Sequence, residues 1–300
     1  MTTLDRQNLL YGQDSTERIV AVERAGRDRI RIFRRIADGR ITSEFNDLRP
    51  WVIVTDPGAA ALAGYGTPDR LAGDLPLRHR FVFSSWGAYQ DAVQILREKA
   101  IPHQTFPNPV DQYLTGTGRT LFKGMIFDDL VRLQLDIETV GLDATQENAC
   151  VLVIALATNR GHRETLHLRD FTEPEMLEQT NERIQRLDPD VIEGHNLYNF
   201  DLPFLLERAR RHGLALTWGR DGSPVRLGAT QRVKVGARSV PFQPAAIFGR
   251  HIIDTYQQIQ RYDAANELQS YGLKASIDAL GLTRPDRVFV PGAEIAAVWE

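Results

Sequence analysis

Two acidic residues, Asp136 and Glu138, stand two positions apart in the run Val131-Arg-Leu-Gln-Leu-Asp-Ile-Glu-Thr139. The run alternates apolar and polar residues as a half-buried strand does, so both carboxylates are expected on one face. A third carboxylate, Asp201, ends the segment Asn196-Leu-Tyr-Asn-Phe-Asp201. Divalent cations such as Mg²⁺ take carboxylate oxygens, and two ions about 3.5–4 Å apart can hold the attacking and leaving oxygens of a phosphodiester. The three acids therefore predict a metal-dependent nuclease.

Each acid also has a simpler interpretation. In a chain of this length an Asp-x-Glu triplet is expected on the order of once by chance. These two acids, however, interrupt an otherwise apolar strand, where unpaired charges are costly unless they are solvated or bind a cation. Asp201 stands directly before the helix predicted over 202–212 and could act only as its N-cap. Capping would not explain the pair on the strand.

Composition restricts the class of protein. The chain has 300 residues, 42% of them hydrophobic, and a net charge of −3, which predicts one large or two ordinary globular domains. It contains no apolar stretch long enough to span a bilayer and begins without a signal-peptide pattern, so no membrane partner is expected. The single cysteine, Cys150, excludes an intramolecular disulfide. A buried, inert thiol and a cytoplasmic location are expected.

One stretch is basic against this background. Between residues 219 and 250 the only acid is Asp221, and the basic residues are Arg220, Arg226, Arg232, Lys234, Arg238 and Arg250. Such a stretch could follow a phosphate backbone, with Arg232, Lys234 and Arg238 as candidate contacts. It could equally be a solvated hairpin, because Gln231-Arg-Val-Lys-Val235 alternates and Arg220-Asp-Gly-Ser223 is typical of a turn. The sequence leaves both interpretations open.

The predicted elements indicate two domains with a boundary near Lys123, where prolines and glycines accumulate. Residues 1–123 are expected to form a smaller β-rich α+β domain, with a hairpin over 19–33, strands at 49–55 and 79–83 and a helix at 86–99. In 124–300, strands at 131–138, 149–157, 163–168, 191–194 and 251–254 alternate with helices at 173–187, 202–212, from 255 and at 273–280. This pattern predicts an α/β domain with a mixed sheet flanked by helices. Asp254 has capping-box spacing and is interpreted as structural rather than as a metal ligand.

The motifs Asp136-Ile-Glu-Thr139 and Asn196-x-x-x-Phe200-Asp201 resemble the first two exonuclease motifs of the DEDD-type 3′–5′ exonucleases. The closer resemblance is to the proofreading exonuclease of family B DNA polymerases. Further segments look like connecting elements of that family: Leu121-Phe-Lys-Gly-Met-Ile-Phe127, the basic hairpin, His251-Ile-Ile-Asp254 and Ser270-Tyr-Gly-Leu-Lys-Ala275. The first domain is more loosely similar to the N-terminal domain of these polymerases. The resemblance implies an RNase H-like fold for residues 124–300.

The resemblance also implies a mechanism and a substrate. Asp136, Glu138 and Asp201 would hold Mg²⁺ or Mn²⁺ in a two-metal site, and water would attack the terminal phosphodiester of a single-stranded DNA 3′ end. This is the proofreading reaction of DNA replication and repair, with the remaining polymerase domains of a parent chain as partners. Asn196 and Phe200 would contact the terminal nucleotide. Phe200 could equally be a core residue, because it precedes an apolar helix face.

One motif of that family is missing. Its third motif, Tyr-x-x-x-Asp, supplies a fourth carboxylate, but after residue 254 the tyrosines 256, 262 and 271 are followed four positions later by Gln260, Asn266 and Ala275. The chain is therefore expected to stop before this motif, with an incomplete second metal site and weak or absent activity. The alternative is a non-catalytic module that binds single-stranded nucleic acid or organises a polymerase. A glycoside hydrolase fits less well, because its two carboxylates should face each other across a cleft.

Overall fold

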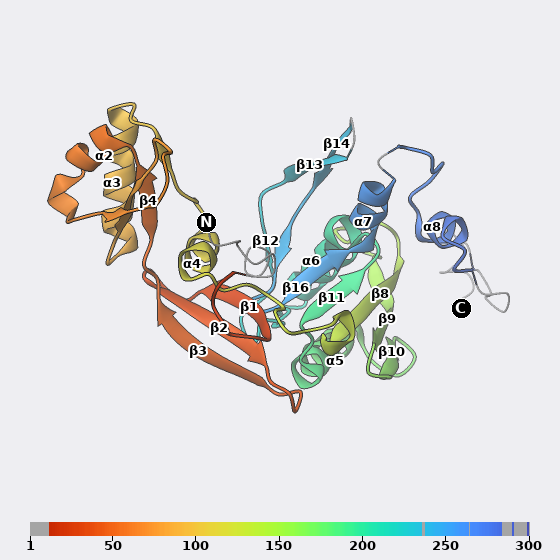
Figure 1. Cartoon of the computed structure of the whole chain (residues 1–300). Coiled ribbons are helices and arrows are strands. Elements are labelled where there is room, and N and C mark those ends of the chain that lie inside the picture. Colours follow the sequence, from red (N-terminus) through yellow and green to blue (C-terminus); the bar gives the residue numbers. More distant parts are fainter. Residues whose placement is uncertain (1–11, 236–237, 264, 284–289, 291–298, 300) are drawn as a thin grey trace. The chain divides into compact units, whose positions relative to one another are not determined.

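The structure is a computed structural model that describes residues 12–235, 238–263, 265–283, 290 and 299. It divides into two compact units, Met1–Ile126 and Phe127–Glu300, which are described separately below (Figure 1). This division lies close to the boundary expected near Lys123. Among the described residues, the helices are too short or too polar to span a membrane.

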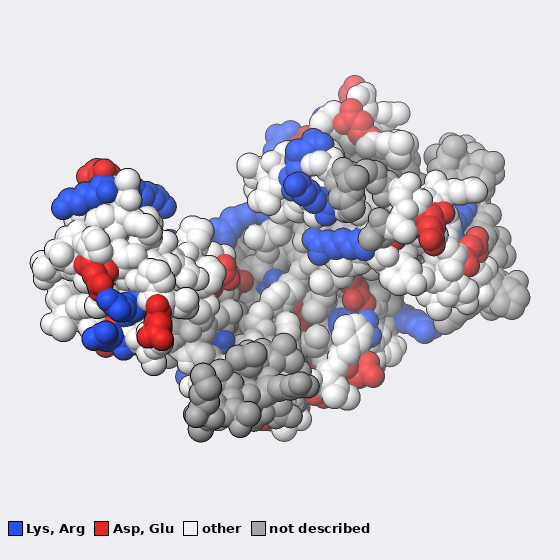
Figure 2. Space-filling view, turned by 45° about the horizontal axis from the view of Figure 1, so that its top comes forward, with Lys and Arg blue, Asp and Glu red and all other residues white. Residues whose placement is uncertain are grey.

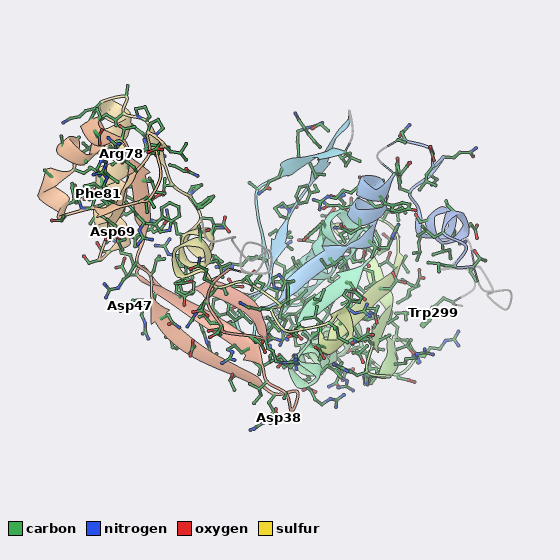
Figure 3. The ribbon with its side chains drawn as sticks, viewed as in Figure 1. Asp38, Asp47, Asp69, Arg78, Phe81 and Trp299 are labelled. Atoms are coloured by element: carbon green, nitrogen blue, oxygen red, sulfur yellow. The ribbon has the colours of Figure 1, made fainter. Side chains whose placement is uncertain are left out.

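The first unit contains two antiparallel sheets and short helices. One sheet has the order β1-β2-β3, and the other has the order β5-β6-β4-β7. The strands are β1 (Ile19–Arg24), β2 (Arg29–Arg35), β3 (Ile41–Asp47), β4 (Trp51–Val54), β5 (Asp69–Arg70), β6 (His79–Val82) and β7 (His103–Gln104), and the helices are α2 (Asp56–Ala61), α3 (Trp86–Glu98) and α4 (Pro109–Thr117). Phe81 of β6, labelled in Figure 3, belongs to the buried core of this unit. The β-rich α+β character expected for this region is confirmed.

Strand β3 and helix α4 are among the elements of the first unit that are not predicted from the sequence. Strand β3 is almost entirely exposed, so its sequence lacks the apolar alternation that marks a half-buried strand. Helix α4 lies in the stretch whose prolines indicated a connecting segment. Pro109 occupies the first turn, where a missing N–H costs nothing, and the Asn108 side chain accepts from the Val110 N–H at 2.8 Å. Gly118 ends the helix in the left-handed conformation.

The second unit is built on a five-stranded mixed sheet with the order β10-β9-β8-β11-β16. Strands β8, β9 and β10 are antiparallel neighbours, whereas β11 runs parallel to both β8 and β16. The strands are β8 (Arg132–Val140), β9 (Cys150–Thr158), β10 (Arg163–His167), β11 (Val191–Gly194) and β16 (His251–Asp254), and the main helices are α5 (Glu173–Leu187), α6 (Leu202–Arg211), α7 (Thr255–Tyr262) and α8 (Leu273–Ala279). This is the predicted mixed sheet flanked by helices.

The two faces of β8 differ in chemistry. Leu133, Leu135 and Ile137 are buried in a core that includes residues of α5 and α6. Gln134, Asp136 and Glu138 alternate with them and lie on the opposite side, which we call the acidic face. Cys150, at the start of β9, is only partly buried rather than fully buried as expected. Burial nevertheless raises the pKa of its thiol.

A buried ion pair joins α5, α6 and β9. The Glu173 carboxylate accepts from the Val151 N–H at 2.8 Å, and from Arg208 Nε at 2.9 Å and Nη2 at 2.7 Å. His212 Nε2 lies 2.7 Å from the same carboxylate. Burial alone would raise the pKa of Glu173, but the hydrogen bonds from Arg208 and His212 outweigh it, and the pKa is lowered. The carboxylate therefore stays charged inside the unit.

Replacing Arg208 with Ala is expected to destabilise the second unit severely. Removing one partner leaves a buried charge without compensation, which costs roughly 3–5 kcal/mol. Urea unfolding at pH 7 measures the loss. The matched control is Arg210→Ala on the same helix, because the Arg210 side chain is 70% exposed and pairs with Glu207 at the surface. Equal losses for both variants would contradict a structural role for the buried pair.

One described residue that follows α8, Trp299, contacts the segment after β10 in the same unit. Trp299, labelled in Figure 3, accepts a hydrogen bond at its carbonyl from Arg169 Nη2 at 2.9 Å. The Arg169 guanidinium also lies over the indole ring, 4.9 Å from its centroid. This cation–π contact and hydrogen bond fix Trp299 beside the segment that follows β10.

Candidate active site

Asp136 and Glu138 lie on the acidic face, as the alternation of the strand predicts. Asp136 is exposed, and Glu138 is partly buried. Burial raises the pKa of Glu138, and the negative charge of Asp136 raises it further. Two like charges this close are unfavourable for each other, and a shared cation would remove that cost.

Asp201 is not a helix cap. It ends a π-helical turn, η3 (Leu197–Asp201), that continues directly into α6, and its backbone angles, φ −58° and ψ −52°, are themselves helical. Its side chain makes no capping hydrogen bond. The capping interpretation of Asp201 is therefore wrong. π-Helical turns are rare and occur frequently at functional sites.

The environment of Asp201 disfavours its charged form. The residue is 2% exposed, and no ion pair of its carboxylate occurs among the described residues. Burial raises the pKa of Asp201 to about 7, and the charges of Asp136 and Asp254 contribute in the same direction. Hydrogen bonds from the backbone of Asp201 and Ile137 act against this rise. A cation shared with Asp136 would offset the cost of this buried carboxylate.

The end of β11 makes room for this carboxylate beside β8. Strand β11 pairs with β8 only as far as Gln134, and beyond that point the backbone of Ile137 in β8 hydrogen-bonds to the Asp201 carboxyl. Gly194 ends β11 in close contact with β8, because a Cβ atom there would lie 2.5 Å from the Leu135 carbonyl oxygen. Only glycine fits at this position without a shift of the backbone.

Asp254 holds the segment that carries Asp201. Its Oδ1 accepts from the backbone N–H of Asn196 and of Tyr256, both at 2.9 Å, and its Oδ2 accepts from the Tyr198 N–H at 3.0 Å. The residue is 1% exposed. Asn196 adopts a left-handed conformation, φ +74°, which the bond to Asp254 secures. The predicted capping of α7 is confirmed, and the same carboxylate also fixes a distant turn.

A pocket of about 410 Å³ opens on the acidic face. It is lined by residues that include Asp136, Arg163, Glu193, His195 and Thr255. Both nitrogens of His195 have partners, Thr255 Oγ1 at 3.0 Å and the Tyr271 carbonyl oxygen at 2.9 Å, so we interpret this histidine as structural. Glu193 was not singled out in the sequence, although an acid within the apolar run Val-Ile-Glu-Gly was a visible signal. It accepts from Arg132 Nη1 at 3.0 Å and from Gln134.

The carboxylates do not form a compact three-ligand cluster. Over the part of the chain that the structure describes, no group of three His, Cys, Asp or Glu side chains is positioned to hold a metal ion. Asp136 is nevertheless electrostatically coupled to both Glu138 and Asp201. Their hard oxygen atoms suit Mg²⁺ or Mn²⁺ chemically. The assignment of Asp136, Glu138 and Asp201 as ligands therefore stays a prediction.

Two of the basic residues considered for nucleic-acid binding are buried instead. Arg220 donates to Asp188 at 2.9 Å and to Asp190 at 2.7 Å, and Arg250 donates to Asp188 at 2.7 Å. The arginine side chains are 4% and 1% exposed. Both arginines anchor the base of the hairpin to the end of α5, so they cannot contact a phosphate backbone.

The other nucleic-acid candidates differ in accessibility. Arg232 and Lys234 are exposed on β13 (Gln231–Val235), which pairs with β14 (Arg238–Phe242), so the predicted hairpin is present. The side chain of Arg238 lies outside the described residues. Asn196 is partly exposed, whereas Phe200 packs on the core with its ring 5.6 Å from that of Phe204. Basic and acidic side chains are interspersed on the surface in view (Figure 2).

A mixed sheet covered by helices, with carboxylates on one strand and at the start of a neighbouring helix, is typical of an RNase H-like fold. Residues 168–275 match the model of the exonuclease domain of DNA polymerase family B. Over these residues the chain is therefore similar to the exonuclease domain of family B DNA polymerases. The match includes Asp201, and Asp136 and Glu138 precede it.

Individual relatives agree with this family. The chain is 28% identical over 254 residues to DNA polymerase 2 of Aeropyrum pernix, covering 78% of this chain and 28% of that protein. It is 30% identical over 201 residues to DNA polymerase 1 of Pyrococcus abyssi, covering 63% and 24%. The structure of the family B DNA polymerase from Pyrobaculum calidifontis matches with a TM-score of 0.66 and 20% identity, covering 93% of this chain and 41% of that one. This last likeness establishes the fold. The chain spans about a quarter of the length of the two sequence relatives.

Proposed function

We propose that this chain is a divalent-cation-dependent 3′–5′ exonuclease module that shortens single-stranded DNA from its 3′ end. The observation that carries the proposal is Asp201, a buried carboxylate that caps no helix and is electrostatically coupled to Asp136. A carboxylate of this kind lowers the stability of the fold unless something binds it. A cation shared with the acidic face would supply that compensation.

The residues divide into three roles. Asp136, Glu138 and Asp201 would hold Mg²⁺ or Mn²⁺, which when bound would stabilise charge on the phosphodiester and promote attack by water. Because the pKa of Asp201 is about 7, this carboxyl would release a proton when a cation binds near neutral pH. Asn196, on the turn fixed by Asp254, would contact the terminal nucleotide. Arg232 and Lys234 would contact phosphates.

Polymerase domains are the proposed partners of this module. The curated relatives are named DNA polymerases, and this chain spans about a quarter of their length. The third carboxylate motif, Tyr-x-x-x-Asp, does not occur after residue 254. We therefore expect slow cleavage by the 300-residue chain, because one ligand of the second ion is not supplied by the motifs identified.

The proposal is tested with a single-stranded oligonucleotide labelled at its 5′ end and incubated with the purified chain and Mn²⁺ or Mg²⁺. A slow ladder of products shortened from the 3′ end is expected, and a label at the 3′ end should be released as mononucleotide. Asp136→Asn should abolish the ladder, whereas Glu178→Gln, an exposed acid on α5, should leave it unchanged. Cleavage that survives Asp136→Asn would show that the acidic face is not the site.

The second candidate is a non-catalytic module that binds single-stranded nucleic acid, supported by the exposed cations on β13. Metal binding separates the two candidates even if cleavage is slow. For the exonuclease, Mn²⁺ should raise the Tm of the wild-type chain but not that of Asp136→Asn. Salt-dependent DNA binding with neither cleavage nor a Mn²⁺ effect would favour the second candidate.

A further inference from the structure

A second pocket, of about 450 Å³, lies beside the π-helical turn that ends at Asp201. Tyr198 and Asn199 line it from η3, and Pro203 lines it from α6. The opposite wall comes from the hairpin and its exit, with Pro241, Phe242 and Gln243. The pocket includes none of the three carboxylates, so it is a separate site on the same unit.

Two aromatic rings form the apolar part of this pocket. The rings of Tyr198 and Phe242 have their centroids 5.5 Å apart and are tilted by 54°. Both side chains are only partly buried. Tyr198 is held at both ends, since its N–H donates to Asp254 at 3.0 Å and its hydroxyl donates to the Ile252 carbonyl at 3.3 Å. A fixed, partly exposed aromatic pair offers a stacking surface at little entropic cost.

The pocket is lined by the turn that ends at Asp201 and by the strand that pairs with the strand of the exposed cations. Tyr198 and Asn199 stand three and two residues before Asp201 in the same turn. On the hairpin side, Arg232 is the direct ladder partner of Pro241. Arg232 and Lys234 lie on the same face of the hairpin, because they are two residues apart on β13. The pocket therefore adjoins both the segment that carries Asp201 and the strand pair that carries the cations.

We propose that the pocket binds a nucleobase of single-stranded nucleic acid by stacking on Phe242 and Tyr198. The base belongs to a nucleotide upstream of the bond to be cleaved, so this inference rests on the proposed exonuclease function. Stacking on an aromatic face tolerates any base, which suits an enzyme that must accept every terminal sequence. Phe242 thereby gives the hairpin a role that its charges alone do not provide.

The test compares binding of a fluorescein-labelled deoxythymidine decamer with binding of a decamer in which internal nucleotides are abasic. Both are measured by anisotropy in EDTA, so the result does not depend on cleavage. The wild-type chain should bind the intact decamer about tenfold more tightly, as expected for the loss of a stacked base. Phe242→Leu keeps an apolar side chain without a ring and should bind the two decamers equally well. Phe242→Tyr should keep the wild-type ratio of the two affinities.

The control is Phe45→Leu in the first unit, which removes a ring that is 51% exposed and packs against Arg29. This variant should keep the wild-type ratio. The proposal is overturned if the wild type does not distinguish the two decamers, if Phe242→Leu keeps the ratio, or if Phe242→Tyr loses it while folded. If cleavage fails in the metal-dependent assay but the ratio depends on Phe242, the exonuclease proposal fails and the base site stands.

Discussion

Replacing Asp201 with Asn is expected to reduce metal-dependent cleavage by at least about a hundredfold, because a lost ligand removes several kcal/mol of transition-state stabilisation. Asn is nearly isosteric with Asp, so the packing of η3 against α6 is retained. The rate of 3′-end shortening with Mn²⁺, measured for the two proteins at equal folded concentration, gives the ratio. Full activity in the variant would exclude Asp201 from the site.

The same substitution is expected to stabilise the metal-free protein at alkaline pH. The fold raises the pKa of Asp201 from 3.8 to about 7. Between these values the folded state binds more protons than the unfolded state, so wild-type stability falls as pH rises and is constant above about pH 7. Asn cannot ionise. Asp201→Asn should therefore gain on the order of 2–4 kcal/mol at pH 8 and nothing below about pH 4.

Urea unfolding in EDTA at several pH values measures this difference. The control is Asp143→Asn, because hydrogen bonds from Thr145 and Gln146 lower the pKa of Asp143 to about 2. The pH dependence of Asp143 is opposite to that of Asp201, because the fold favours the charged form of Asp143. Its contribution to the free energy of unfolding is present above the unfolded-state pKa. Asp143→Asn should lose stability at pH 8. A loss for Asp201→Asn as well would mean that Asp201 has a structural role.

Local periodicity explains which parts of the fold could be predicted from sequence. Strand β8 has one apolar and one polar face, so its alternation is visible in nine residues. Strand β3 is exposed on both faces and depends on pairing with β2, which no local pattern records. Helix α4 was hidden by the prolines and glycines that begin and end it. These elements depend on context that a local pattern does not contain.

The roles of the polar residues in the site could likewise be predicted only in part from the sequence. The sequence identified Asp136, Glu138 and Asp201 because their spacing is local, but it could not separate a ligand from a cap at Asp201. A count of charges also placed Arg220 and Arg250 with the exposed cations. Their partners, Asp188 and Asp190, lie about thirty and sixty residues earlier in the chain, so only the fold brings them together. Net charge along a segment does not reveal burial.

Asp254→Ala is expected to lower cleavage by about 10–100-fold although Asp254 is not a proposed ligand, the loss typical of a residue that orients a metal site. The substitution leaves the N–H groups of Asn196, Tyr198 and Tyr256 without their acceptor, at a cost of about 1–3 kcal/mol for each buried group. Asn196 would then lose the bond that secures its left-handed conformation, and Asp201 would shift relative to β8. Measurement of kcat and KM should place the loss mainly in kcat, provided that the folded fraction is determined by urea unfolding.

A structural role alone would give a different result, and Asp263→Ala provides the comparison. Asp263 is 6% exposed and accepts from the Glu267 and Leu268 N–H groups at 2.7 and 3.0 Å and from the Tyr271 hydroxyl at 2.8 Å, and none of these donors lies in the turn that leads to Asp201. Its loss should destabilise the unit while leaving the cleavage rate of the folded protein near that of the wild type. Asp254→Asn adds a second readout, because the charge of Asp254 raises the pKa of Asp201. Removing that charge should lower the pH above which the stability of the metal-free protein no longer changes. Equal cleavage rates and equal pH dependence for the Asp254 and Asp263 variants would refute the positioning role of Asp254.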